Sequence, residues 1–195
     1  MTPLFPLACI AFVNAARTSL SYRSMSQCLA AASRDAIASL PSLNQPNGSV
    51  MTPDALSDKL TGKRVALYFA AGWCPMCTSF EPSLLQFREA ATSSGKNVEI
   101  IYVPSDRSEA DVARRTEAMG MLSVPIGEEA NAMKRRYKIW AGSECGTLGT
   151  GRRSGVPALV VLDSKKGDEM AFLPAESKGV KALDSWPLDG VDALW

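Results

Sequence analysis

Two cysteines three positions apart are the residues most able to do chemistry in this chain of 195 residues. Cys74 and Cys77 stand within residues 68–82, which read YFAAGWCPMCTSFEP. A pair with this spacing can act as a redox dithiol, supply half of a metal site or simply pack in a core. The chain has no histidine, so serine–histidine and cysteine–histidine nucleophiles and histidine metal ligands are excluded.

The residues around the pair predict that it lies where a strand meets a helix. Residues 63–71 form a nearly continuous apolar run, which is typical of a strand buried on both faces. After the pair, apolar side chains recur every three or four positions up to Gly95, which predicts an amphipathic helix. Cys74 would be its capping or first residue, with Pro75 in the first turn, where a missing N–H is tolerated. Cys77 would follow one turn later on the same face.

This position predicts different roles for the two sulfurs. A helix N-terminus carries partial positive charge and unpaired N–H groups, and both stabilise a thiolate. Cys74 would therefore attack a substrate disulfide, and Cys77 would resolve the resulting mixed disulfide. A zinc site needs four ligands, for which only Cys145 and carboxylates remain, so we predict no metal. A purely structural pair of buried cysteines stays open as the alternative.

The remaining pattern predicts an α/β fold. Strands are expected at residues 98–104 and in a hairpin within 158–173, and helices are expected to begin at Ser108 and Gly127. This order predicts a central mixed sheet, with parallel strands plus a C-terminal antiparallel hairpin, flanked by helices. Residues 140–155 are rich in glycine and are interpreted as an inserted surface loop.

The N-terminal part has a different composition. Residues 1–34 are rich in Ser and Ala and contain arginines but no acid, as organellar transit peptides do. A disordered leader is the other interpretation. We predict a leader and linker over residues 1–42 and a folded domain over 43–195. Five cysteines, an odd number, make a poor disulfide framework and favour an intracellular, cytoplasmic protein, with organellar targeting left open.

Composition also limits the partners. The chain has 21 Lys and Arg residues and 20 Asp and Glu residues, so its charge gives no reason to expect nucleic acid as a partner. No apolar run reaches the roughly 18 residues that a membrane-spanning helix needs, so we expect no membrane partner.

A resemblance to a known family starts at residues 66–82, which read ALYFAAGWCPMCTSFEP. This segment resembles the active-site segment of the thioredoxin superfamily, and in particular that of tryparedoxins and nucleoredoxins. Those families typically have a Trp-Cys-Pro-Pro-Cys core, in which Met76 here replaces the second proline. The similarity continues in MGMLSVPIGEEANAMKRRYKI and DSWPLDG and covers about residues 46–190.

The resemblance implies a thioredoxin-like fold and a thiol–disulfide oxidoreductase that reduces protein disulfides without a cofactor. Its partners would be disulfide-containing protein substrates and an upstream dithiol reductant. The stretch SGVPALVVLD resembles the segment that holds the family's cis-proline, so Pro157 is implied to be cis and to face Cys74. Trp73, Pro75, Val156 and Pro157 would then form the substrate-binding surface.

Asp106 and Cys145 have open roles. Thioredoxins bury an aspartate beneath the cysteines, and this chain has Tyr68 there, as tryparedoxins and nucleoredoxins do. Asp106 or a water is then left to take the proton of Cys77. Cys145, in the inserted segment, could act as a third redox position, although a thiol without a role is the simpler interpretation. A nucleoredoxin-type protein that binds partners in a redox-dependent way and a redox-inert domain are the alternative functions.

Overall fold

The structure is a computed structural model that describes residues 34–189, 194 and 195. The predicted leader, with Cys9 and Cys28, falls almost wholly on residues 1–33, outside the described residues. In chain order the elements are α2 (Pro53–Leu60), β1 (Arg64–Ala70), α3 (Pro75–Ser93), β2 (Val98–Pro104), α4 (Glu109–Met119), β3 (Leu122–Ser123), α5 (Glu128–Tyr137), the 3₁₀ helix η1 (Gly142–Glu144), α6 (Cys145–Leu148), β4 (Ala158–Leu162), β5 (Glu169–Leu173), α7 (Ala175–Lys178) and the 3₁₀ helix η2 (Gly179–Ser185).

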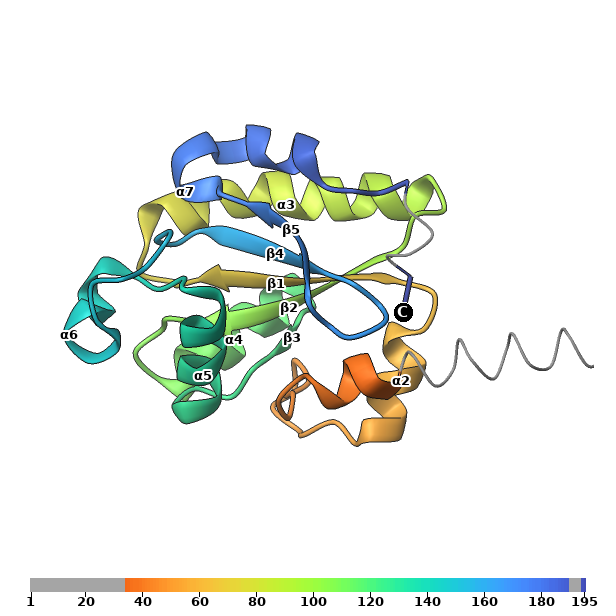
Figure 1. The fold of residues 1–195 in the computed structure, drawn as a ribbon, viewed down its shortest axis with the longest axis horizontal. Helices are drawn as coiled ribbons and strands as arrows, with labels where there is room; N and C mark the ends of the chain where they lie inside the picture. The colour runs from red at the N-terminus through yellow and green to blue at the C-terminus, as the bar shows by residue number, and fades with distance from the viewer. Residues whose placement is uncertain (1–33, 190–193) are drawn as a thin grey trace, which may run out of the picture. The chain divides into compact units, whose positions relative to one another are not determined.

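A five-stranded sheet carries the fold, and its strands lie in the order β3-β2-β1-β4-β5 (Figure 1). The pairs β1–β2 and β2–β3 are parallel, whereas β4 pairs antiparallel with both β1 and β5. The predicted mixed sheet with a C-terminal antiparallel hairpin is therefore confirmed. Because β1 and β2 are parallel, the segments that follow them leave the sheet at the same end. The cysteine pair, after β1, and Asp106, after β2, therefore lie at the same end of the sheet.

Different helices cover the two faces of β1. Tyr68 points to the face shared by α3 and α4, where its hydroxyl meets Cys77 and Glu81. The next residue, Phe69, points the other way and packs edge-on against Tyr137 of α5, with ring centroids 6.0 Å apart. Every residue of β1 is buried, which explains the continuous apolar run in the sequence.

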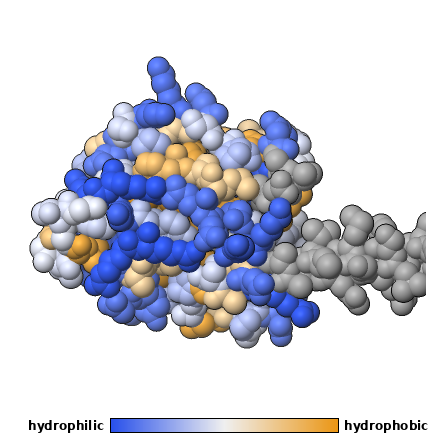
Figure 2. Space-filling view, in the orientation of Figure 1, coloured by the Kyte–Doolittle hydropathy of each residue, from blue (hydrophilic) through white to orange (hydrophobic). Residues whose placement is uncertain are grey.

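Two helices begin where the sequence predicts. Ser108 caps α4 by accepting the backbone N–H of Asp111 at 3.2 Å, and α3 begins directly after Cys74. Among the residues that the structure describes, none of the helices is both long and apolar enough to cross a membrane. Figure 2 shows that hydrophilic residues cover most of the face in view, with separate hydrophobic patches between them.

Residues 140–155 are more ordered than the predicted loop, and this corrects the sequence interpretation. They contain η1 and the one-turn helix α6. The carboxylate of Glu144, at the end of η1, accepts hydrogen bonds from the Ala141 N–H at 2.9 Å, the Ser105 hydroxyl at 2.7 Å and the Lys134 ammonium at 2.5 Å. Lys134 is only 3% exposed. Contacts from other elements therefore hold the segment, and local glycine content could not reveal them.

The hydrophobic core extends upstream of residue 43. Ala36 and Ile37 lie in a short helical segment and belong to this core. The division between linker and domain at residue 43 stays a prediction. At the C-terminal end, Trp195 is buried, and its backbone N–H donates to the Lys63 carbonyl at 2.9 Å, beside the start of β1.

Candidate functional site

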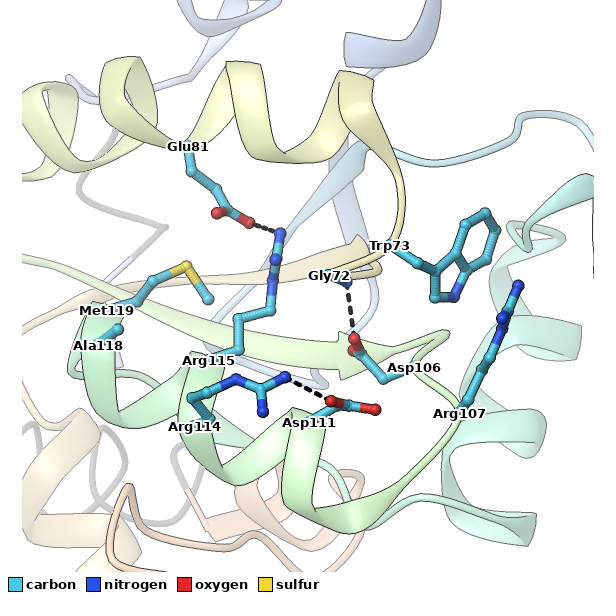
Figure 3. Close-up of a pocket in the computed structure, with 10 residues that line it drawn as sticks. All are labelled: Gly72, Trp73, Glu81, Asp106, Arg107, Asp111, Arg114, Arg115, Ala118 and Met119. Carbon is cyan, nitrogen blue, oxygen red and sulfur yellow. Dashed lines mark hydrogen bonds and ion pairs between the residues drawn. The ribbon is translucent and has the colours of Figure 1, made fainter.

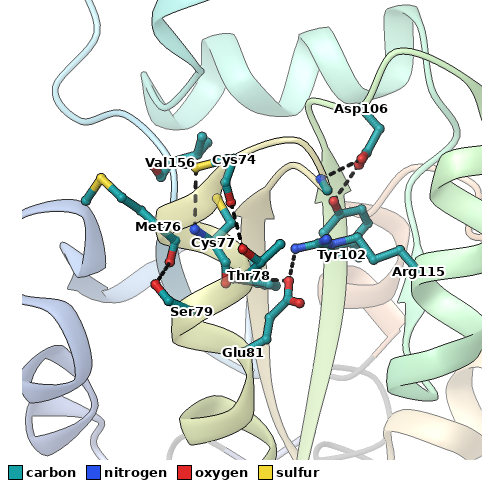
Figure 4. A network of polar contacts seen from close by, with 12 residues as sticks. Cys74, Met76, Cys77, Thr78, Ser79, Glu81, Tyr102, Asp106, Arg115 and Val156 are labelled. Carbon is teal, nitrogen blue, oxygen red and sulfur yellow. Dashed lines mark hydrogen bonds and ion pairs between the residues drawn. The ribbon is translucent and has the colours of Figure 1, made fainter.

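The two cysteines lie at the junction of β1 and α3. Cys74 is the N-cap residue of α3, and Pro75 is its first helical residue. The Cys74 sulfur accepts the backbone N–H of Cys77 at 3.4 Å (Figure 4). A thiolate at this place would face both this N–H and the positive end of the helix dipole. Both residues are free thiols.

The surroundings of the two sulfurs differ. Cys74 is 7% exposed, whereas Cys77 is fully buried. Burial raises the pKa of the Cys77 thiol above its ordinary value, and a hydrogen bond with Cys74 raises it further. The Cys77 thiol therefore keeps its proton at neutral pH and needs an acceptor before it can act as a nucleophile.

The segment before β4 lies against Cys74. The Val156–Pro157 peptide bond is cis, which confirms what the resemblance implied. The Cys74 thiol donates to the Val156 carbonyl oxygen at 3.7 Å (Figure 4). Val156 thus borders the Cys74 sulfur, and the role of Val156 and Pro157 in binding substrate stays a prediction.

Two exposed apolar side chains flank Cys74. Trp73 is 39% exposed and Met76 is 48% exposed. The Trp73 indole N–H donates to the Ser105 carbonyl at 2.8 Å, and the Arg107 guanidinium lies 5.6 Å from the centre of the ring. This hydrogen bond fixes the orientation of the indole. Met76 was not among the predicted binding residues, although an apolar side chain in the exposed first turn of a helix was a readable signal.

Asp106 lies near the site, but its carboxylate bonds to other groups. It accepts the backbone N–H of Gly72 at 2.7 Å and the hydroxyl of Tyr102 at 2.5 Å (Figure 4). A Cβ atom at Gly72 would come within 3.0 Å of this carboxylate, so glycine permits the close approach. Among the described residues, neither cysteine is a hydrogen-bond partner of Asp106. Its role as proton acceptor stays a prediction.

Sequence reasoning missed a polar cluster beneath the cysteines. The Tyr68 hydroxyl donates to the Cys77 carbonyl at 3.5 Å and to the Glu81 carboxylate at 3.4 Å. Glu81 in turn forms an ion pair with Arg115 of α4. Glu81 follows Cys77 by four positions, so helical spacing already placed both on one face of α3. Arg115 is 34 positions away from Glu81, and no local pattern connects them.

A pocket of about 530 Å³ opens between α3 and α4, next to Trp73 (Figure 3). Glu81 and Arg115 line it from the two helices, and Asp106 lines it from the segment after β2. Glu81 and Arg115 of the polar cluster beneath Cys77 thus line a pocket that extends to Trp73.

Cys145 begins α6 and is partly exposed. Figure 1 shows α6 at the same end of the sheet as the start of α3. Cys145 is a free thiol here, so a third redox position stays a prediction. In the part of the chain that the structure describes, no cluster of three or more His, Cys, Asp or Glu side chains is placed to hold a metal ion.

The fold and the cysteine pair match a known family. The thioredoxin-like family model matches residues 62–169, more than half of the chain, so this chain belongs to the thioredoxin-like family. Members of this family are generally oxidoreductases.

Individual relatives agree with this assignment. Nucleoredoxin from Homo sapiens is 34% identical over 109 residues, which cover 55% of this chain and 22% of that protein. The structure of tryparedoxin I from Leishmania major has a TM-score of 0.52 at 26% identity and covers 74% of this chain and 88% of that one. A thioredoxin from Wuchereria bancrofti has a TM-score of 0.52 at 28% identity and covers 76% and 89%. The predicted resemblance to tryparedoxins and nucleoredoxins is confirmed, although this chain spans about a fifth of the length of the nucleoredoxins.

Proposed function

We propose that this protein is a thiol–disulfide oxidoreductase that reduces protein disulfides through Cys74 and Cys77. The observation that carries the proposal is the difference between the surroundings of the two sulfurs, which lie one turn apart at the N-terminus of α3. Cys74 keeps 7% of its surface exposed and its sulfur accepts a helix N–H, whereas Cys77 lies fully buried one turn behind it. This arrangement suits an attacking thiol and a resolving thiol.

The reaction then runs in two exchanges. The Cys74 thiolate attacks one sulfur of the substrate disulfide, and the other substrate sulfur leaves with its electron pair and takes up a proton. Cys77 next loses its proton and attacks the Cys74 sulfur, which releases the second substrate sulfur and closes the Cys74–Cys77 disulfide. An upstream dithiol reductant returns two electrons and two protons to this disulfide. No further cofactor takes part.

A protein substrate fits the surface around Cys74. Trp73 and Met76 are exposed on either side of Cys74, and the Val156 carbonyl oxygen accepts from the Cys74 thiol. Exposed apolar groups of this kind bury surface against another polypeptide more readily than against a small polar disulfide. A reducing compartment such as the cytoplasm would supply the dithiol reductant.

Reduction of insulin by dithiothreitol tests the proposal, because reduced insulin precipitates and scatters light. The wild-type chain should accelerate precipitation, and Cys74→Ser should reduce the rate to that of dithiothreitol alone. In a separate reaction without dithiothreitol, reduced Cys77→Ser should accumulate a mixed disulfide with insulin, visible on a non-reducing gel. A Cys145→Ser chain serves as the matched control for loss of a partly exposed thiol. A wild-type chain that leaves the rate unchanged would contradict the proposal and favour a partner-binding or redox-inert domain.

A further inference from the structure

Three side chains from three elements form a connected polar group beneath the cysteine pair. The Tyr68 hydroxyl, from β1, lies 3.5 Å from the Cys77 carbonyl oxygen and 3.4 Å from the Glu81 carboxylate, and it donates to both. Glu81, from α3, is paired with Arg115, from α4 (Figure 4). One end of this polar group therefore contacts the backbone of Cys77. The Cys77 thiol is the one of the pair that must lose a proton inside the protein.

Glu81 is half-buried and keeps some contact with solvent. Its side chain is 14% exposed and that of Arg115 is 11% exposed. Both line the pocket between α3 and α4 (Figure 3), so the carboxylate touches Tyr68 on its inner side and the pocket on its outer side. A proton that reaches Glu81 can therefore pass to solvent through this pocket.

The charges around Glu81 suit a group that takes up and releases a proton. Burial raises the pKa of its carboxyl and is opposed by the positive charge of Arg115 and the hydrogen bond from Tyr68, while the nearby Asp106 adds a small increase. Burial also raises the pKa of Tyr68, and the charges of Glu81 and Cys77 raise it further. The Tyr68 side chain therefore stays a neutral hydroxyl. A neutral hydroxyl can receive a proton on its oxygen while it donates its own.

We propose that Glu81, acting through the Tyr68 hydroxyl, accepts the proton that Cys77 loses when it resolves the mixed disulfide, and passes it to water in the pocket between α3 and α4. The inference rests on the proposed oxidoreductase function. In this step the Cys77 thiol proton moves to the Tyr68 oxygen as the Tyr68 proton moves to the Glu81 carboxylate. The Cys77 electron pair forms the bond to the Cys74 sulfur, and the substrate sulfur leaves with the electrons of the broken bond and is protonated by solvent.

Asp106, the acceptor that the sequence suggested, is less well placed for this task. Its carboxylate accepts the Gly72 backbone N–H and the Tyr102 hydroxyl, and among the described residues neither cysteine donates to it. Arg115 lies over the Tyr102 ring, 5.8 Å from its centre, and so stands between the two carboxylates. The Glu81 carboxylate accepts from the same Tyr68 hydroxyl that lies 3.5 Å from the backbone carbonyl oxygen of Cys77, and the charge of a Cys77 thiolate would act on that hydroxyl.

Single-turnover reaction with dithiobis-nitrobenzoate separates the two exchanges, because each releases one coloured nitrobenzoate thiolate. All chains are full length. Cys9, Cys28 and Cys145 are replaced by serine, so that Cys74 and Cys77 are the thiols left to react with the reagent. Glu81→Gln and Tyr68→Phe should leave the first release unchanged and slow the second on the order of 10²-fold near neutral pH. Glu99→Gln, which breaks a different, half-buried ion pair with Lys63 at 2.8 Å, is the matched control and should keep both rates.

The pH profile and a rescue distinguish proton transfer from structural support. The second release should rise with pH as Glu81 ionises, since only the carboxylate can accept a proton, and Glu81→Gln should lose this rise while Glu81→Asp keeps it. Formate, a small carboxylate that fits the pocket, should restore part of the second release in Glu81→Ala. Wild-type rates and pH profile in both Glu81→Gln and Tyr68→Phe, or loss of the rise in Asp106→Asn alone, would overturn the inference. Absence of any first release in the parent chain would instead overturn the proposed function.

Discussion

At the scale of single residues, burial makes the reactivity of the Cys77 thiol, inside α3, different from that of the Cys74 thiol, which caps the same helix. The raised pKa of Cys77 lowers its thiolate fraction below that of an ordinary cysteine, whose pKa is about 8.5. Iodoacetamide near neutral pH should therefore modify Cys74 and leave Cys77 intact, and Cys77 should react only at a pH well above that at which an ordinary cysteine reacts. Peptide mass mapping across a pH series measures both. The urea-unfolded chain is the control, in which the two should react alike, and equal rates in the folded chain would contradict the assignment.

The sequence could predict some of the site residues because their signals are local. The spacing of Cys74 and Cys77, and the proline at position 157 before a strand, are visible in a few letters each. The partnership of Glu81 with Arg115 depends on α3 and α4 covering the same face of the sheet, which no local pattern specifies. Asp106 was a reasonable candidate because it follows a strand, but its hydrogen bonds depend on Gly72 lying close enough to donate.

At the scale of elements, α6 shows what composition cannot predict. A four-residue helix is far too short to be stable alone, because the first turn costs more conformational entropy than its hydrogen bonds return. The segment's order must come from tertiary contacts. Glu144 bonds to Ser105, and the Ser105 carbonyl holds the Trp73 indole, so the inserted segment is connected to the surface beside Cys74.

We therefore expect Glu144→Ala to affect the inserted segment and the site together. The change leaves the Lys134 ammonium buried without its carboxylate, which should lower the free energy of unfolding by about 1–3 kcal/mol. Amide hydrogen exchange should become faster in residues 141–149. Glu128→Ala is the control, since it breaks an exposed pair with Arg135 and should change stability by less than about 1 kcal/mol. Unchanged exchange in Glu144→Ala would show that the segment is held by other contacts.

At the scale of the whole molecule, long strands were predictable and short connections were not. β1 and β2 appear as continuous apolar runs because both of their faces are covered. β3 has only two residues, too few for any periodicity, and it is defined by its pairing with Ile101 and Tyr102 of β2. Its other side bridges to Asn44, so residues predicted to lie at the edge of the linker help to complete the sheet.

The sequence predicts that the folded domain starts at residue 43, and the core contacts upstream of that residue make this boundary testable. Ile37 is 8% exposed and Ala36 fully buried, so a chain that starts at Leu43 lacks part of the core that a chain starting at Arg34 retains. Removing a buried isoleucine side chain exposes apolar surface worth about 1.5–3 kcal/mol. Urea unfolding should show a difference of this size between the two chains, with a lower midpoint for the shorter one and a similar slope. Ile37→Ala in the chain that starts at Arg34 is the matched control and should account for most of the loss. Equal midpoints would instead place the boundary near residue 43, as the sequence predicts, and would make the helical segment before it dispensable.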